Sequence, residues 1–232
     1  MFCRFRGTGR FGKKTSFGEG VVRVTVRRAA LTGFALILLL GILVEIVAAR
    51  FFSPSYDWIR NTVSDLGVTT CTTLHNYYGA VELCSPAHAW VNASMAVGGL
   101  AMIGLATVRV HTAGFDRFAG LSWVVAGVST LAMALVPQDV SPELHAFVSI
   151  PQLVALPLAV FIGSLKYRGV IGGAGRVVGA VGLGAGLWLL LDVSVYTHAG
   201  LLERMILWPA FLWAVFVSAF GRLRERRLLA VA

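Results

Sequence analysis

The side chains that could do chemistry gather in four short polar blocks, each beside a long apolar run. These blocks are RNTVSDLG at 60–67, SPAHAWVN at 85–92, VPQDVSPELH at 136–145 and LDVSVYTHAGLLER at 191–204. They supply the carboxylates, imidazoles, guanidiniums and hydroxyls that acid–base catalysis, metal binding and recognition of charged groups use. Ionisable groups near membrane depth are costly unless they are paired or face water, so each block is a candidate site.

The third block offers an Asp and His pair at the start of an expected helix. Asp139 and His145 lie six residues apart across the helix start at Ser141 or Pro142. Such a pair orients a general base or binds a metal ion. The structural alternative is that Asp139 caps the helix while His145 satisfies a neighbouring carbonyl. With Asp65 of the first block, these residues are the candidate catalytic groups.

The fourth block contains an arginine in an unfavourable position. Arg204 lies near the start of the last apolar run, where the helix dipole disfavours a cation, so we expect it to have a specific partner among the outer aspartates. We expect Asp65 to pair with Arg204, and Arg60 with Asp139 or Asp192. A paired arginine is either architectural or holds a phosphate or carboxylate group of a ligand bidentately. The candidate ligand-binding residues are Arg60, Asn61, Ser64, Asp192, His198, Glu203 and Arg204.

Two other chemistries stay open at this point. His145, His198 and two of the aspartates are suitable zinc ligands, but no HxxxH or HExxH pair places two ligands on one helix face. Ser64 or Ser85 is a conceivable nucleophile with His145 as base, although no GxSxG elbow is present. The sequence therefore leaves the need for a metal or cofactor, and enzyme activity itself, undecided.

The elements that must position these blocks are membrane-spanning helices. Hydrophobic residues make up 57% of the 232 residues and charged residues 13%, about half the roughly 25% of a soluble domain. Six windows reach the roughly 20 apolar residues that a span requires, at 29–49, 87–108, 117–136, 143–165, 171–191 and 203–221. We predict an all-α, six-helix membrane domain over 29–222 with an outer loop at 50–86, a disordered basic tail at 1–28 and a second basic tail at 223–232.

The positions of the basic residues predict the orientation. All Lys and Arg except Arg50, Arg60 and Arg204 lie in the terminal segments or in or beside the second-to-third and fourth-to-fifth connections. By the positive-inside rule, both termini of this multi-pass cell-membrane protein are cytoplasmic. The same distribution argues against nucleic acid as a partner, because the basic residues follow the membrane topology. Most acids and histidines then lie on the outer side, so any chemistry is expected there.

Cysteine and glycine positions add two structural predictions. Cys71 and Cys84 lie in the outer loop, where an oxidising compartment permits a disulfide between them. The fifth span contains two Gly-x-x-x-Gly repeats, which allow close approach of helices in lipid. Pro151 and Pro157 interrupt the hydrogen-bond ladder of the fourth span, and we expect a kinked helix whose neighbours satisfy the freed groups.

These four blocks carry a resemblance to a known family. RNTVSDLG after the first span, an SP shortly before the second, VPxD followed six residues later by His, and GLLER opening the sixth resemble the DUF998 family of six-span prokaryotic membrane proteins. The SDLG block is more weakly similar to the Frag1/DRAM/Sfk1 group, whose members are linked to membrane-lipid remodelling and autophagy. The resemblance implies a six-helix fold with an outward polar pocket. The loop between Cys71 and Cys84 is longer than the family pattern leads us to expect.

The leading functional hypothesis is a protein that binds, processes or moves a lipid or other amphiphile through this outward pocket. In that hypothesis Arg60 and Arg204 hold an anionic head group. A small transporter or channel is the first alternative, although no acid except Glu45 lies at mid-bilayer and the two halves show no repeat. A structural subunit of a membrane complex is the second alternative.

Overall fold

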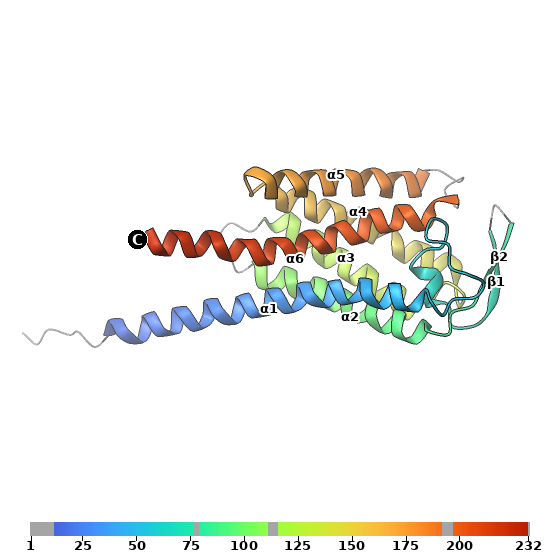
Figure 1. The fold of residues 1–232 in the computed structure, drawn as a ribbon, viewed down its shortest axis with the longest axis horizontal. Coiled ribbons are helices and arrows are strands. Elements are labelled where there is room, and N and C mark those ends of the chain that lie inside the picture. Colours follow the sequence, from blue (N-terminus) through green and yellow to red (C-terminus); the bar gives the residue numbers. More distant parts are fainter. Residues whose placement is uncertain (1–11, 77–78, 111–115, 192–196, 232) are drawn as a thin grey trace, which may run out of the picture.

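Six long helices form the molecule. The computed structural model describes residues 12–76, 79–110, 116–191 and 197–231. The helices are α1 (Gly12–Ala48), α2 (His88–Val110), α3 (Arg117–Leu135), α4 (Pro142–Ser164), α5 (Gly169–Leu191) and α6 (Ala199–Val231). Each contains a segment long and apolar enough to cross a bilayer, and they lie roughly parallel to one long axis (Figure 1). The predicted all-α, six-span architecture is confirmed.

The structure differs from the predicted boundaries at both ends and in the outer loop. α1 begins at Gly12, so the part of the predicted disordered tail from Gly12 onward is helical. A helix extends at little cost once it is nucleated, and Val-rich residues continue the first span toward its N-terminus. α6 similarly continues to Val231 through the predicted basic tail. The outer loop holds a short 3-10 turn, η1 (Ser64–Gly67), and two strands, which a purely helical reading missed.

The two strands form a small antiparallel hairpin. β1 (Thr72–Asn76) pairs with β2 (Gly79–Leu83), with Thr72 opposite Leu83 and Asn76 opposite Gly79. The predicted cysteines flank this hairpin, and a disulfide joins Cys71 to Cys84. Because a disulfide and a strand ladder tie the same two segments together, the hairpin has a fixed base at the end of the helical bundle (Figure 1).

Five of the helices form a ring. Helices adjacent in sequence pack side by side, α1 also packs against α6, and α4 packs against α6. These contacts arrange α1, α2, α3, α4 and α6 around a common centre, while α5 packs on the outside against α4 and α6. Figure 1 shows α5 along one edge of the bundle.

Glycines account for the close packing of α5. A Cβ atom added at Gly179 would lie 2.6 Å from the Cβ of Phe161 and 2.7 Å from its backbone nitrogen on α4. One added at Gly186 would lie 2.5 Å from the carbonyl oxygen of Leu153, also on α4. Real Cβ atoms do not approach backbone this closely, so only glycine fits. The Gly-x-x-x-Gly prediction of tight helix packing is confirmed.

Ser129 bridges the α4 backbone beside the proline that interrupts its hydrogen-bond ladder. Pro151 lies inside the helix and cannot donate a backbone hydrogen bond. The Ser129 hydroxyl of α3 donates to the carbonyl of Val148 and accepts from the backbone N–H of Gln152 at 3.1 Å. A side chain of a neighbouring helix therefore bridges the backbone pair beside the proline, Val148 and Gln152.

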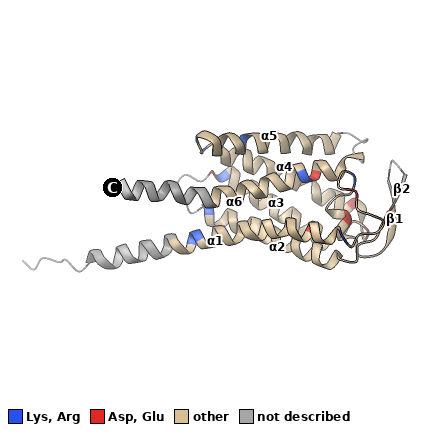
Figure 2. Cartoon of the chain, in the orientation of Figure 1, with Lys and Arg blue, Asp and Glu red and all other residues tan. Residues whose placement is uncertain are grey.

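Charge is segregated along the bundle axis. Figure 2 shows most Asp and Glu of the described chain near the hairpin end and most Lys and Arg toward the opposite end. We call residues 50–87, which connect α1 to α2 and include η1 and the hairpin, the cap. The polar blocks of the sequence meet at the cap end of the bundle, so the candidate site is built there.

Candidate functional site

Arg204 is the centre of a buried polar cluster that binds α1, α6 and the cap together. Its Nε lies 2.7 Å from Oε1 of Glu45, and both side chains are less than a tenth exposed. Nη1 donates to the carbonyl oxygens of Trp58, Asn61 and Gly200 at 2.8–3.0 Å. The guanidinium also lies over the aromatic rings of Trp58 and Tyr56, both in the cap.

Tyr56 and Trp208 complete this cluster. Nη2 of Arg204 donates to the phenol oxygen of Tyr56, which in turn donates to the cap carbonyls of Asn61 and Thr62. Burial is the main reason that the pKa of Tyr56 is raised well above its usual value, so the phenol remains a donor. Trp208 donates from Nε1 to Oε2 of Glu45 at 2.8 Å, so both oxygens of that carboxylate have a partner.

Two predicted ion pairs, Asp65 with Arg204 and Arg60 with Asp139, do not form, and the alternative of Arg60 with Asp192 lies outside the described residues. Arg204 pairs with Glu45, which comes from the end of α1, and not with Asp65. Arg60 lies 3.7 Å from Asp57, its neighbour within the cap, and its side chain is 71% exposed. A buried arginine needs a buried anion, and Glu45 is closer to membrane depth than the loop aspartates. Arg204 is engaged by the protein itself, which leaves little of it to hold a ligand's anionic group.

Asp65 is a node of hydrogen bonds within the cap. Its Oδ2 accepts from the Asn61 side-chain amide and from the backbone of Thr62, each at 3.0 Å. Its Oδ1 accepts from the Gln138 amide at 2.5 Å. Gln138 lies in the α3–α4 connection, so Asp65 fastens the cap to that connection.

His145 also connects the cap to α4. Its Nδ1 lies 2.6 Å from the carbonyl oxygen of Val136, and its Nε2 lies 2.9 Å from the Ser64 hydroxyl. A carbonyl accepts only, so Nδ1 carries the proton and Nε2 accepts from Ser64. A hydroxyl that donates to an imidazole whose other nitrogen is held by a third group is the arrangement of an activated serine. Both side chains are buried.

Asp139 does not pair with His145, contrary to the expectation from their spacing. Its Oδ2 accepts from the backbone and hydroxyl groups of Thr69 and Thr70 at 2.8–3.1 Å. Burial raises the pKa of Asp139, but these four hydrogen bonds outweigh it and hold the pKa below its usual value. Asp139 does not cap α4 either, because Ser141 is the N-cap residue there and makes no side-chain capping bond. Asp139 therefore binds four donors of the cap and not the imidazole of His145.

The remaining predicted residues lie apart from this network. His198 is exposed and contacts the Thr197 hydroxyl, its sequence neighbour. Asp192 falls outside the described residues. The structure therefore brings Asn61, Ser64, Asp65 and His145 together and leaves Arg60 and His198 aside. Among the described residues, no group of three His, Cys, Asp or Glu side chains is placed to hold a metal ion, so the proposed zinc set is not assembled.

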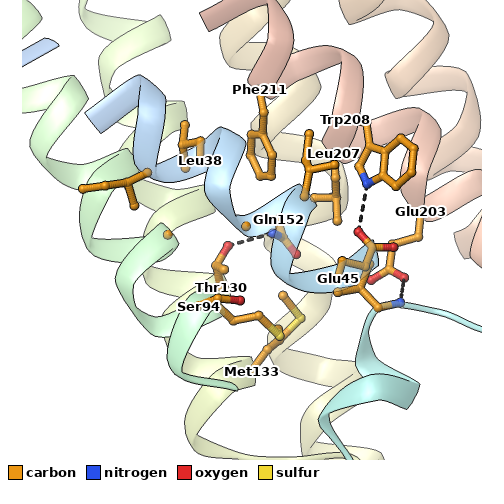
Figure 3. Close-up of a pocket in the computed structure, with 16 residues that line it drawn as sticks. Leu38, Glu45, Ser94, Thr130, Met133, Gln152, Glu203, Leu207, Trp208 and Phe211 are labelled. Carbon is orange, nitrogen blue, oxygen red and sulfur yellow. Dashed lines mark hydrogen bonds between the residues drawn. The ribbon is translucent and has the colours of Figure 1, made fainter. Parts of the chain in front are cut away.

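A cavity of about 60 Å³ lies inside the helix ring beneath the cap (Figure 3). Most of its lining is apolar, from side chains such as Leu38, Met133 and Phe211. Gly41 of α1 contributes no side chain, and a Cβ atom added there would meet nothing within 4 Å. The polar lining residues are Glu45, Ser94, Thr130, Gln152, Glu203 and Trp208. At the cap end, Oε2 of Glu203 accepts from the backbone N–H of Val63 at 2.7 Å.

Sequence reasoning found Glu203 but missed most of this cavity. Gln152 follows a proline inside an apolar run, and a lone amide at that depth was a usable signal. Gln138 and Tyr56 gave no such signal, because their roles depend on how the cap folds back over the bundle. Thr130 and Ser94 resemble the small residues of any tightly packed membrane helix.

Comparison with known proteins identifies the family. A family model described as "Protein of unknown function (DUF998)" matches residues 35–219. The chain therefore belongs to the DUF998 family, as its motifs suggested. Searches of curated proteins and of solved structures found no match.

Proposed function

We propose that this DUF998 protein binds one end of a lipid or other amphiphile in the cavity beneath the cap. The observation that carries the proposal is the cavity itself, a mainly apolar space within the membrane-spanning bundle into which a few polar groups converge. Binding sites for small molecules have this composition.

The size of the cavity limits what enters. Pockets that enclose a whole drug-sized ligand measure roughly 300–1,000 Å³, whereas this cavity measures about 60 Å³. It has room for a small head group or a chain end, and not for an entire lipid. The rest of an amphiphile would remain between the helices and the surrounding bilayer.

The polar cluster of the cap positions this cavity. Arg204 fixes Glu45 of α1 against α6 and the cap, and Asp65 with His145 fastens the cap to α4. We assign these residues, with Asn61, to positioning, and Glu203 to contact with the ligand. We further propose that the cap faces the outside of the cell and both termini the cytoplasm. The charge segregation in Figure 2 and the disulfide of the cap support that orientation.

Filling the cavity tests the proposal. Gly41→Leu places a side chain in the open space at the cavity wall, and we expect at least a tenfold loss of copurifying amphiphile, measured by mass spectrometry of the detergent-purified protein. Gly33→Leu is the matched control, because Gly33 lies on the same helix, is exposed, and also has nothing within 4 Å of an added Cβ. Equal retention by both variants would contradict the proposal.

Acyl transfer is a second candidate function, favoured by the hydrogen bond between Ser64 and His145. In this reading Ser64 is the nucleophile and His145 its base, oriented by the Val136 carbonyl. A fluorophosphonate probe should then label wild-type protein on Ser64 and leave Ser64→Ala and His145→Ala unlabelled. Ser85→Ala is the control, because the Ser85 hydroxyl donates to the Leu66 carbonyl and no imidazole of the described chain is hydrogen-bonded to it. Absence of labelling on folded wild-type protein would reject this candidate.

A further inference from the structure

The cavity's carboxylates differ in how well they are satisfied. Glu45 has Arg204 on one oxygen and Trp208 on the other. Glu203 accepts a single hydrogen bond, from the backbone of Val63, and has no ion pair within the described part of the chain. An unpaired carboxylate inside a membrane-spanning bundle is costly unless a ligand or water completes its shell.

Most donors around the cavity are already committed to the protein. The Ser94 hydroxyl donates to the Val91 carbonyl at 2.9 Å, and the Thr130 hydroxyl donates to the Ala126 carbonyl at 2.8 Å. The Gln152 amide donates one of its two hydrogens to the Thr130 oxygen at 2.7 Å (Figure 3).

The Trp208 N–H and the Val63 N–H are likewise committed, each to a glutamate of the cavity. The lining therefore offers a ligand mainly acceptors: the Glu203 carboxylate, the amide oxygen of Gln152 and the lone pairs of Ser94.

This inventory selects among head groups. A phosphate or carboxylate would face the Glu203 carboxylate with few donors to bind it, which is unfavourable. An alcohol donates only one hydrogen bond. A primary ammonium has three donors and no acceptor, and its positive charge balances the Glu203 carboxylate. It is also compact enough for a cavity of about 60 Å³. Trp208 and Phe211 add aromatic lining, which favours a cation when a ring face is presented.

We propose that the group entering this cavity is a primary ammonium, with Glu203 as its counter-ion. This inference rests on the proposed function, because it specifies the ligand of the same cavity. It replaces the anionic head group expected from the sequence with a cationic one. The ammonium is available on a free alkylamine or on an aminophospholipid.

Matched probes separate these possibilities. Protein in a neutral maltoside detergent is equilibrated with tetradecylamine or tetradecanol at pH 7, and retained probe is quantified by mass spectrometry after gel filtration. We expect at least tenfold more amine than alcohol on the wild type. Glu203→Gln keeps the side-chain shape and should lower amine retention about tenfold without changing alcohol retention. Glu82→Gln, on the exposed hairpin, is the control and should match the wild type.

A second arm compares phosphatidylethanolamine with phosphatidylcholine, which differ in the ammonium. Preference for phosphatidylethanolamine identifies the source as a phospholipid, and preference for the alkylamine alone identifies a free amine. Equal retention of amine and alcohol by wild-type protein, or an unchanged ratio in a Glu203→Gln variant that elutes as folded protein, would overturn the ammonium assignment. If Gly41→Leu abolished retention of both the amine and the alcohol, the proposed function would stand even with the ammonium assignment overturned. If Gly41→Leu left retention of both unchanged, the proposed function would fail as well.

Discussion

Arg204 joins three parts of the chain that are far apart in sequence. It contacts Glu45 near the end of α1, cap carbonyls between residues 58 and 61, and Gly200 on its own helix. A lysine has one nitrogen and could not reach these acceptors together. We therefore assign an architectural role to Arg204 and propose its sequence neighbour Glu203 as the residue that contacts a ligand.

Removing one partner of the buried pair should destabilise the protein strongly. Arg204→Met leaves the Glu45 carboxylate buried without its cation, which typically costs about 3–5 kcal/mol. We expect a lower apparent Tm in detergent, measured by tryptophan fluorescence. The double variant Glu45→Leu with Arg204→Met should recover much of that loss, because no uncompensated charge remains. A single variant that melts with the wild type would show that the pair contributes little.

Asp139 should make the attachment of the cap sensitive to acid. Its pKa in the folded protein lies below the usual value, so the ionised form is stabilised by folding. That stabilisation is complete above the unfolded pKa of about 3.9 and is lost as pH falls through the folded pKa. Asp139→Asn should therefore lower Tm at pH 7 and reduce it less below pH 4. A difference in Tm that stays constant from pH 7 to pH 3 would contradict this assignment.

At the scale of the elements, α5 depends on glycine to reach α4. Gly179→Leu forces a side chain into the backbone of Phe161, and overpacking of this kind typically costs about 1–3 kcal/mol or more. We expect a lower Tm and a shift toward aggregate in gel filtration. Gly184→Leu is the control, since an added Cβ at that exposed position meets nothing within 4 Å. Comparable behaviour of the two variants would argue against close α4–α5 packing.

The spans were predictable from sequence because a bilayer demands long apolar runs, and the α5 glycines because close helix contact demands small residues at fixed spacing. The partners of single polar side chains were not. The sequence predicts an outer aspartate as the partner of Arg204 because both share the expected outer side, and His145 as the partner of Asp139 because the two are close in sequence. Both choices depended on how residues 50–87 fold over the bundle, which no periodicity encodes. The hairpin was missed for the same reason.

For the whole molecule, the charge segregation predicts which end faces the outside. A cysteine at the exposed cap residue Ser55 should react with a membrane-impermeant maleimide on intact cells. One at Arg168, in the α4–α5 connection at the opposite end, should react only after permeabilisation. Cys71 and Cys84 are disulfide-bonded and should not contribute, and the remaining cysteine, Cys3, is replaced by alanine in both variants. The reverse pattern of labelling would place the cap on the cytoplasmic side.

The central claim is that an amphiphile places its polar end inside the helix ring. An alkylamine with a photoreactive diazirine next to its ammonium tests this directly, with adducts located by peptide mass spectrometry. We predict adducts on cavity residues such as Met95, Met133 and Leu207, and their loss in Gly41→Leu but not in Gly33→Leu. Adducts confined to exposed side chains of α1 such as Leu36, Leu40 and Leu43, and unchanged in Gly41→Leu, would show that the probe samples only the outside of the bundle.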